Sequence, residues 1–164
     1  MRMSEACAHA EAGAHGLTGA ALATALDRAE VRCAQQGERL TGPRRRVLEL
    51  LLEAGQPTKA YDLIAAYGED GVPAKPPTVY RALGFLERLG FAHRIESLNA
   101  YVPCRMEGEG HQAAFLICDC CGDTREIEPP GGVGLRETAA GSGYELERVT
   151  IEAHGRCAAC ARTA

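Results

Sequence analysis

Apolar residues recur at intervals of three and four positions through the first half of the chain, which is the spacing of one face of an α-helix. The pattern predicts four helices, over residues 18–36, 43–54, 59–67 and 77–89. Thr18 is placed to cap the first of them, and Cys33 falls on its apolar face, so we expect this cysteine in the core. Glycines such as Gly37 and Gly55 follow the helices and end them.

After the fourth helix the spacing changes to the alternation that is typical of β-strands. Two short runs, residues 91–96 and 101–104, flank a polar turn and predict a hairpin. Helices followed by a hairpin describe a winged helix-turn-helix, in which residues 77–89 form the helix that enters a major groove of DNA. Its apolar side, expected to face inward, comprises Val79, Leu83 and Leu86. The side expected to point elsewhere comprises Thr78, Arg81 and Phe85.

The second half of the chain predicts a small sheet. Three strands are expected, over residues 113–118, 124–128 and 144–153, with a short helix over residues 133–141. A sheet of this size buries little surface of its own, so a bound metal and a second copy of the chain would both stabilise it. We therefore expect a homodimer that forms through this half.

The expected fold class is α+β, with an N-terminal winged helix-turn-helix domain and a small C-terminal α/β dimerisation domain that holds a structural zinc. The expected divisions are a tail over residues 1–16, a DNA-binding domain over 17–103, a hinge loop over 104–112 and a dimerisation and metal-binding domain over 113–164. Cys7, His9 and His15 in the tail suggest either an accessory metal site or no site at all.

Two Cys-x-x-Cys pairs stand at the two ends of the second half, and they are the strongest chemical signal in the chain. The four cysteines are Cys118, Cys121, Cys157 and Cys160. Four thiolates suit one tetrahedral zinc and leave no open position for catalysis, so the site is expected to be structural. The alternatives are a set of disulfides or ordinary buried cysteines. Cys120 lies inside the first pair, but the two-residue gap favours its neighbours as ligands.

Composition and charge change this picture only in part. The chain has 164 residues, 46% of them hydrophobic, and a net charge of −4, so as a whole it is not a basic polyelectrolyte. Residues 97–164 carry six basic against ten acidic side chains, which indicates two halves with different roles. No apolar run is long enough for a membrane span, and we expect a cytoplasmic location, where thiols stay reduced.

Several polar side chains of the first half suit contacts with DNA. An arginine on the exposed side of the groove helix can bond guanine edges or phosphates, and tyrosine hydroxyls can donate hydrogen bonds to the backbone. The candidate DNA-binding residues are Arg44, Arg45, Tyr61, Thr78, Tyr80 and Arg81. The alternative is that helix-turn-helix shapes also pack into ordinary bundles and that exposed arginines are common.

Several separate motifs, in order along the chain, resemble those of the Fur superfamily of metal-responsive repressors. In the first half they are residues 39–45 (RLTGPRR), 60–63 (AYDL), 75–83 (KPPTVYRAL) and 90–93 (GFAH). In the second half, residues 115–122 (FLICDCCG) and 151–160 (IEAHGRCAAC) look most like the zinc-uptake-regulator branch, Zur. The similarity covers residues 30 to about 161.

The resemblance implies a dimeric transcriptional repressor, not an enzyme, that binds operator double-stranded DNA and responds to zinc. It implies one structural zinc and one regulatory zinc per chain. The regulatory ligands that match the pattern are His93, Cys104, His111 and Glu126. When zinc binds, it closes the dimer for operator binding and represses zinc-uptake genes. The alternatives are an iron- or peroxide-sensing regulator of the same superfamily, or a zinc hydrolase that uses the same donors with an open water position.

Overall fold

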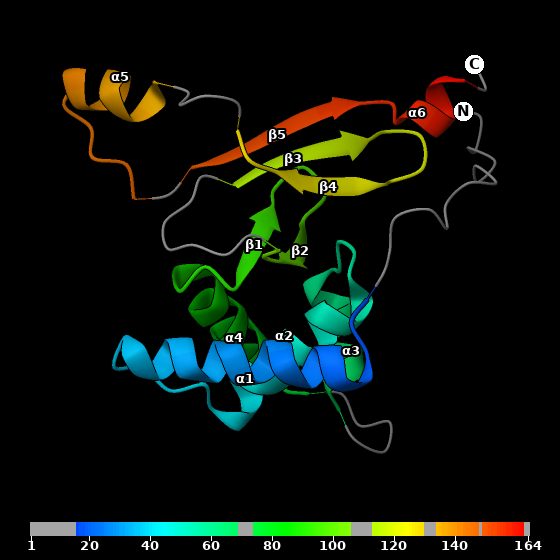
Figure 1. The fold of residues 1–164 in the computed structure, drawn as a ribbon, viewed down its shortest axis with the longest axis vertical. Helices are drawn as coiled ribbons and strands as arrows, with labels where there is room; N and C mark the ends of the chain where they lie inside the picture. Colours follow the sequence, from blue (N-terminus) through cyan, green and yellow to red (C-terminus); the bar gives the residue numbers. More distant parts are fainter. Residues whose placement is uncertain (1–15, 69–73, 106–112, 130–133, 148, 163–164) are drawn as a thin grey trace. The chain divides into compact units, whose positions relative to one another are not determined.

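The computed structural model describes residues 16–68, 74–105, 113–129, 134–147 and 149–162. These residues divide into two compact units, an N-terminal unit up to residue 105 and a C-terminal unit from residue 113 (Figure 1). Among the described residues, no helix combines the length and the apolar character needed to cross a membrane.

Four helices make up most of the N-terminal unit, and all four predictions are confirmed. They are α1 (Gly19–Gln35), α2 (Gly42–Ala54), α3 (Ala60–Tyr67) and α4 (Pro76–Arg88). The apolar faces meet in one core, where α2 packs on α4 and where Val47, Leu51, Val79 and Leu83 are all buried. Cys33 is fully buried in this core, as predicted. Burying each large side chain contributes about 1.5–3 kcal/mol, so the periodic apolar residues account for the packing of the helices.

Two details of these helices differ from the prediction. Thr18 occupies the N-cap position of α1, as predicted, but its side chain makes no capping hydrogen bond. Phe85 was expected to point away from the core, yet only 4% of its surface is exposed. Its ring lies beneath the side chain of Arg44, which the spacing within α4 alone does not reveal.

The predicted hairpin follows α4 directly. Strands β1 (Ala92–Ile95) and β2 (Ala100–Pro103) pair antiparallel, with His93 opposite Val102. β1 packs on α4 and β2 packs on α2, which fixes the hairpin to the helices as a wing. The backbones of Thr58 and Tyr101 exchange hydrogen bonds of 2.9 and 2.8 Å, so β2 is also joined to the segment before α3. The winged helix-turn-helix arrangement is therefore confirmed.

A three-stranded mixed sheet forms the centre of the C-terminal unit, in the order β4-β3-β5. β3 (Ala113–Cys118) pairs antiparallel with β4 (Thr124–Ile127) and parallel with β5 (Thr150–Gly155). Figure 1 shows β3 between the other two arrows. The helices of this unit are α5 (Leu135–Gly141) and α6 (Ala158–Ala161).

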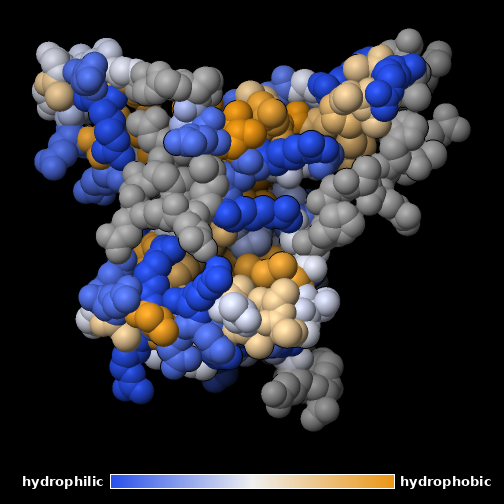
Figure 2. Space-filling model, viewed as in Figure 1, coloured by the Kyte–Doolittle hydropathy of each residue, from blue (hydrophilic) through white to orange (hydrophobic). Residues whose placement is uncertain are grey.

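The prediction for the third strand was partly wrong, because β5 begins at Thr150 and not at residue 144. Residues 144 and 145 are exposed, and without a neighbouring strand their alternation does not produce pairing. The short α6 was not predicted, since four residues are too few to show a helical period. Leu116 of β3 is 46% exposed, and Figure 2 shows apolar side chains at the surface over this sheet.

Candidate metal centre and nucleic-acid interface

The four cysteines of the two Cys-x-x-Cys pairs come together in the C-terminal unit. Cys118 ends β3, Cys121 lies in the turn that follows, and Cys157 and Cys160 belong to the segment after β5. All four sulfur atoms lie within 4.8 Å of one another, and the sulfurs of Cys121 and Cys157 are 3.8 Å apart. A tetrahedron with Zn–S bonds of about 2.3 Å has sulfurs about 3.8 Å apart, so the donor set fits a zinc ion.

The parallel pairing of β3 with β5 is what brings these distant cysteines together. Its register sets Cys118 opposite Gly155, and the amide of Asp119 donates a 2.8 Å hydrogen bond to the carbonyl of Gly155. The turn after Cys118 closes with a 2.9 Å bond from the amide of Gly122, whose φ of 77° is a left-handed conformation that glycine adopts without strain. Both pairs thus lie beyond the same end of the paired strands β3 and β5.

The thiols of the cluster differ in acidity. Amide hydrogen bonds from Cys121 and Cys157 lower the pKa of Cys118 to about 6, and the donor on Cys157 lies 3.2 Å from its sulfur. Burial raises the pKa of Cys160, because a thiolate there loses its hydration. The described cysteines are free thiols, so disulfide pairing among them is not what holds this cluster.

Two further side chains border the cluster. Cys120 is exposed and is not one of the four sulfurs that surround a common point. Nδ1 of His154 lies 2.8 Å from a carboxylate oxygen of Asp119, the residue after Cys118. This contact joins the end of β5 to the first cysteine pair, and nothing in the sequence spacing indicated it.

The predicted regulatory ligands are distributed over both units. His93 on β1 and Cys104 after β2 belong to the wing, and their ligand atoms lie within 4.8 Å of each other. The amide of Cys104 donates a 2.9 Å hydrogen bond to the carbonyl of Phe91, which extends the pairing of the hairpin and brings the thiol beside β1. Glu126 lies on β4 of the C-terminal unit, half-buried. His111, like Cys7, His9 and His15, lies outside the described residues.

The predicted DNA-binding side chains of α3 and α4 are accessible. Tyr61 on α3 is 78% exposed and Tyr80 on α4 is 54% exposed, so both hydroxyls can be reached from solvent. Arg81 is also exposed, and Thr78 is half-buried in the first turn of the same helix. α4 therefore presents a polar face that a groove of DNA can accept.

The two arginines at the start of α2 are already engaged within the protein. A nitrogen of Arg45 lies 3.2 Å from Glu30 and another lies 3.7 Å from Asp27, both on α1. These pairs are solvent-exposed and worth about 0–1 kcal/mol, so a phosphate can replace them at little cost. Arg44 is held differently, with its guanidinium 3.5 Å above the centre of the Phe85 ring.

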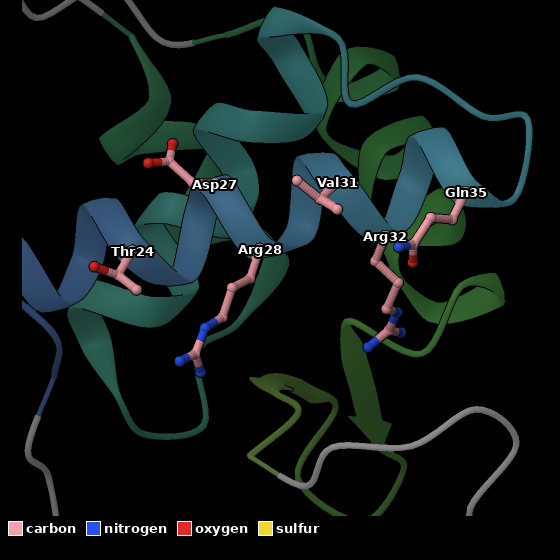
Figure 3. Close-up of a pocket in the computed structure, with 6 residues that line it drawn as sticks. All are labelled: Thr24, Asp27, Arg28, Val31, Arg32 and Gln35. Atoms are coloured by element: carbon pink, nitrogen blue, oxygen red, sulfur yellow. The ribbon is translucent and has the colours of Figure 1, made fainter.

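A shallow hollow runs along the outer side of α1, lined by Thr24, Asp27, Arg28, Val31, Arg32 and Gln35 (Figure 3). All six lining residues belong to this single helix, and no predicted site residue is among them. The candidate functions therefore lie elsewhere, at the thiol cluster, the wing and the exposed side of α4.

One family of known proteins matches the part of the chain that includes α4, the wing and the cysteine cluster. Residues 35–163 match the Ferric uptake regulator family. This chain belongs to the Ferric uptake regulator family. The family resemblance expected from the motifs is confirmed, and with it the expectation of a transcriptional regulator and not an enzyme.

Among proteins of known role, the chain is similar to the zinc uptake regulation protein of Escherichia coli (strain K12). The two are 45% identical over 137 residues, which cover 82% of this chain and 80% of the E. coli protein. The ferric uptake regulation protein of Synechococcus elongatus is 26% identical over 132 residues, covering 79% and 90% of the two chains. Of these two, the zinc uptake regulation protein is the more similar to this chain.

Two solved structures agree in fold and sequence. A zinc uptake regulator complexed with zinc and DNA is 42% identical, with a TM-score of 0.79, and the match covers 88% of this chain and 98% of that one. The holo form of XcZur is 41% identical, with a TM-score of 0.75, and the match covers 85% and 98% of the chains. The expected fold class, a winged-helix domain and a small mixed-sheet domain, is therefore confirmed.

Proposed function

We propose that this chain is a zinc-responsive transcriptional repressor that binds operator DNA as a homodimer and controls zinc-uptake genes. The observation that carries the proposal is the likeness, in sequence and fold together, to a zinc uptake regulator that was solved with both zinc and DNA. The thiol cluster and the polar face of α4 supply the chemistry that such a protein needs. As a regulator that acts on DNA, it is assigned to the cytoplasm.

The first zinc is structural and is held by Cys118, Cys121, Cys157 and Cys160. The sulfur spacing supports this assignment, since one sulfur–sulfur distance of 3.8 Å equals that of a tetrahedral zinc site and no two of the four sulfurs are more than 4.8 Å apart. Four thiolate ligands leave the metal closed to water and substrate, so its role is to join β3 and β5 at their ends. Because the sheet has few large apolar side chains of its own, the metal contributes a large part of the stability of this unit.

The second zinc is regulatory, and its ligands are His93, Cys104, His111 and Glu126. The nearness of the first two on the wing supports half of the set, and a thiolate among nitrogen and oxygen donors favours zinc over iron. The remaining two come from the expected hinge loop and from β4. Zinc that binds all four ligands restricts the movement of the wing relative to the hinge loop and β4. It thereby selects the conformations in which the DNA-binding domains of both subunits fit DNA.

The DNA contacts are assigned to α4 and its surroundings. Arg81 and Tyr80 lie on the exposed side of the helix that enters the major groove, with Thr78 at its start. Phosphate contacts are assigned to Tyr61 and Arg45, and the exposure of Tyr61 and the exchangeable ion pairs of Arg45 support this. The exposed apolar surface over the three-stranded sheet suits a second copy of the chain, which supports a homodimer formed through the C-terminal unit.

A titration of DNA binding against metal tests the proposal. The full-length chain is freed of labile metal with a mild chelator, and binding is followed on duplexes selected by the zinc-loaded protein from a random-sequence library. Binding should appear with Zn²⁺ and should be weak or absent with Fe²⁺ or Mn²⁺. Native mass spectrometry should find one zinc that resists the chelator and one that is removed. Binding that responds to iron alone would instead favour an iron-responsive regulator of the same family.

A further inference from the structure

A cluster of charged side chains encloses Phe85 on α4, and we call it the Phe85 clamp. Its members are Glu38, Arg44, Phe85 and Arg88. The guanidinium of Arg44 lies 3.5 Å from the ring centre and that of Arg88 lies 5.3 Å from it. Glu38 lies between the two cations, 2.8 Å from Arg88 and 3.9 Å from Arg44. The aromatic ring and the carboxylate together offset the repulsion between the two arginines.

The clamp joins α4, the helix proposed to read DNA, to the start of α2 and to the connection between α1 and α2. Glu38 lies in the connection between α1 and α2, and Arg44 belongs to the first turn of α2. Phe85 and Arg88 lie one turn apart near the end of α4. The clamp therefore determines how the C-terminal half of α4 lies against the start of α2, in addition to the apolar core beneath.

Arg44 is held by more than the ring. It also donates a 2.6 Å hydrogen bond to the carbonyl of Arg39, and only 29% of its side chain is exposed. Its flat face and one edge are thus both in use within the protein. Stacking on Phe85 and the bond to Arg39 fix the direction in which the remaining N–H donors of Arg44 point, so the guanidinium cannot turn toward a phosphate without giving up these contacts. Arg45, in contrast, has only exposed ion pairs to exchange.

We propose that Arg44 is a positioning residue for DNA recognition, which sets the orientation of α4 through Phe85 and does not itself contact phosphate. The inference rests on the proposed function, because it assumes that α4 reads DNA. It assigns to Arg44 a different role from the phosphate contact that its place in the sequence suggested. This role of Arg44 gives a reason for the buried ring of Phe85 on α4, close to the exposed side chains of Tyr80 and Arg81.

The two roles predict different dependence on salt. Each phosphate contact contributes about one unit to the slope of log affinity against log salt concentration, so a dimer that loses one contact per chain loses about two units. Loss of orientation leaves that slope unchanged. It also weakens binding to the selected duplex while binding to random-sequence duplex stays the same, because non-specific binding depends on charge and not on the placement of base-reading side chains.

The experiment compares Arg44→Ala, Arg44→Lys and Phe85→Leu in the zinc-loaded, full-length protein. Fluorescence anisotropy is measured over a range of salt on the selected duplex and on random-sequence duplex. Arg44→Ala should weaken selected-duplex binding by roughly three- to thirtyfold, the scale of a cation–π contact, with the slope and the random-duplex affinity unchanged. Arg44→Lys should resemble it, because a lysine keeps the charge but not the planar stacking. Phe85→Leu should have no added effect in the Arg44→Ala background.

Several outcomes would overturn the inference. A slope lowered by about two units, or Arg44→Lys binding like the wild type, would make Arg44 a phosphate contact. An equal loss of affinity for both duplexes, together with a lowered melting temperature, would mean that Arg44 only stabilises the fold. Unchanged binding by Arg44→Ala would overturn the inference and leave the proposed function intact. Absence of zinc-dependent binding by the wild type to either duplex would overturn both.

Discussion

Replacing Cys118 by serine removes one donor from the thiol cluster with little change in size. The sulfur of Cys118 is buried at the end of β3 and accepts a hydrogen bond from the amide of Cys157. A serine hydroxyl keeps its proton near neutral pH, so it accepts that hydrogen bond but does not replace a thiolate ligand of zinc. The variant therefore isolates the contribution of one metal bond from the contribution of side-chain packing.

The magnitude follows from comparing the metal with the apolar core of the same unit. The large buried apolar side chains described there are Phe115, Ile117 and Val149, and at about 1.5–3 kcal/mol each they contribute roughly 5–9 kcal/mol. A structural zinc contributes about 10–16 kcal/mol. The metal is thus the larger stabilising contribution, and the loss of one of its four ligands should cost about 3 kcal/mol, or roughly a hundredfold in zinc affinity.

Thermal melting followed by circular dichroism, zinc content and dimer mass by light scattering together measure this loss. Cys118→Ser should melt at a clearly lower temperature, retain less zinc and dissociate at higher protein concentration than the wild type. Cys120→Ser is the matched control, because it removes an exposed thiol two positions away and should behave like the wild type. A Cys118→Ser protein with normal zinc content, melting and dimer mass would refute a structural metal at this cluster.

Three other predictions concern the regulatory zinc site, DNA recognition by α4 and the ionisation of the cysteine cluster. Cys104→Ser should keep its fold and its chelator-resistant zinc but lose zinc-dependent DNA binding in an anisotropy assay; a normal zinc response would remove Cys104 from the regulatory site. Arg81→Ala should weaken specific binding by about 1–3 kcal/mol and leave zinc content unchanged, and intact binding would place base reading elsewhere. Because the pKa of Cys118 is lowered to about 6, its thiol is ionised in neutral solution, whereas the raised pKa of Cys160 keeps that thiol protonated until metal binds. Zinc loading near neutral pH should thus release fewer than four protons per cluster, as calorimetry in buffers of different ionisation heat can measure. Zinc affinity should fall more steeply with acid below about pH 6, where Cys118 of the metal-free cluster also takes up a proton. Release of all four protons would contradict this view of Cys118.

Much of the fold could be predicted from the sequence because its signals are local. The periods of 3.6 and 2.0 residues separate helices from strands, and the helices α1 to α4 and the wing agree with them closely. The prediction failed where a period was too short to be seen, as in α6, or where alternation lacked a neighbouring strand, as before Thr150. Strand pairing depends on a partner far along the chain, which local spacing does not contain.

The candidate sites divide in the same way. Two Cys-x-x-Cys pairs determine the ligand type, because two cysteines only three positions apart in the chain can bring their sulfurs close together without help from distant residues. Only the parallel register of β3 and β5 brings Cys118 and Cys157 to the same end of the sheet. The spacing along α4 placed Phe85 on an outer side, and only the packing of α2 against it buries the ring beneath Arg44. Sequence thus determined which groups are present and their local geometry, whereas tertiary structure decided which of them meet, because contacts between distant residues depend on how whole elements pack.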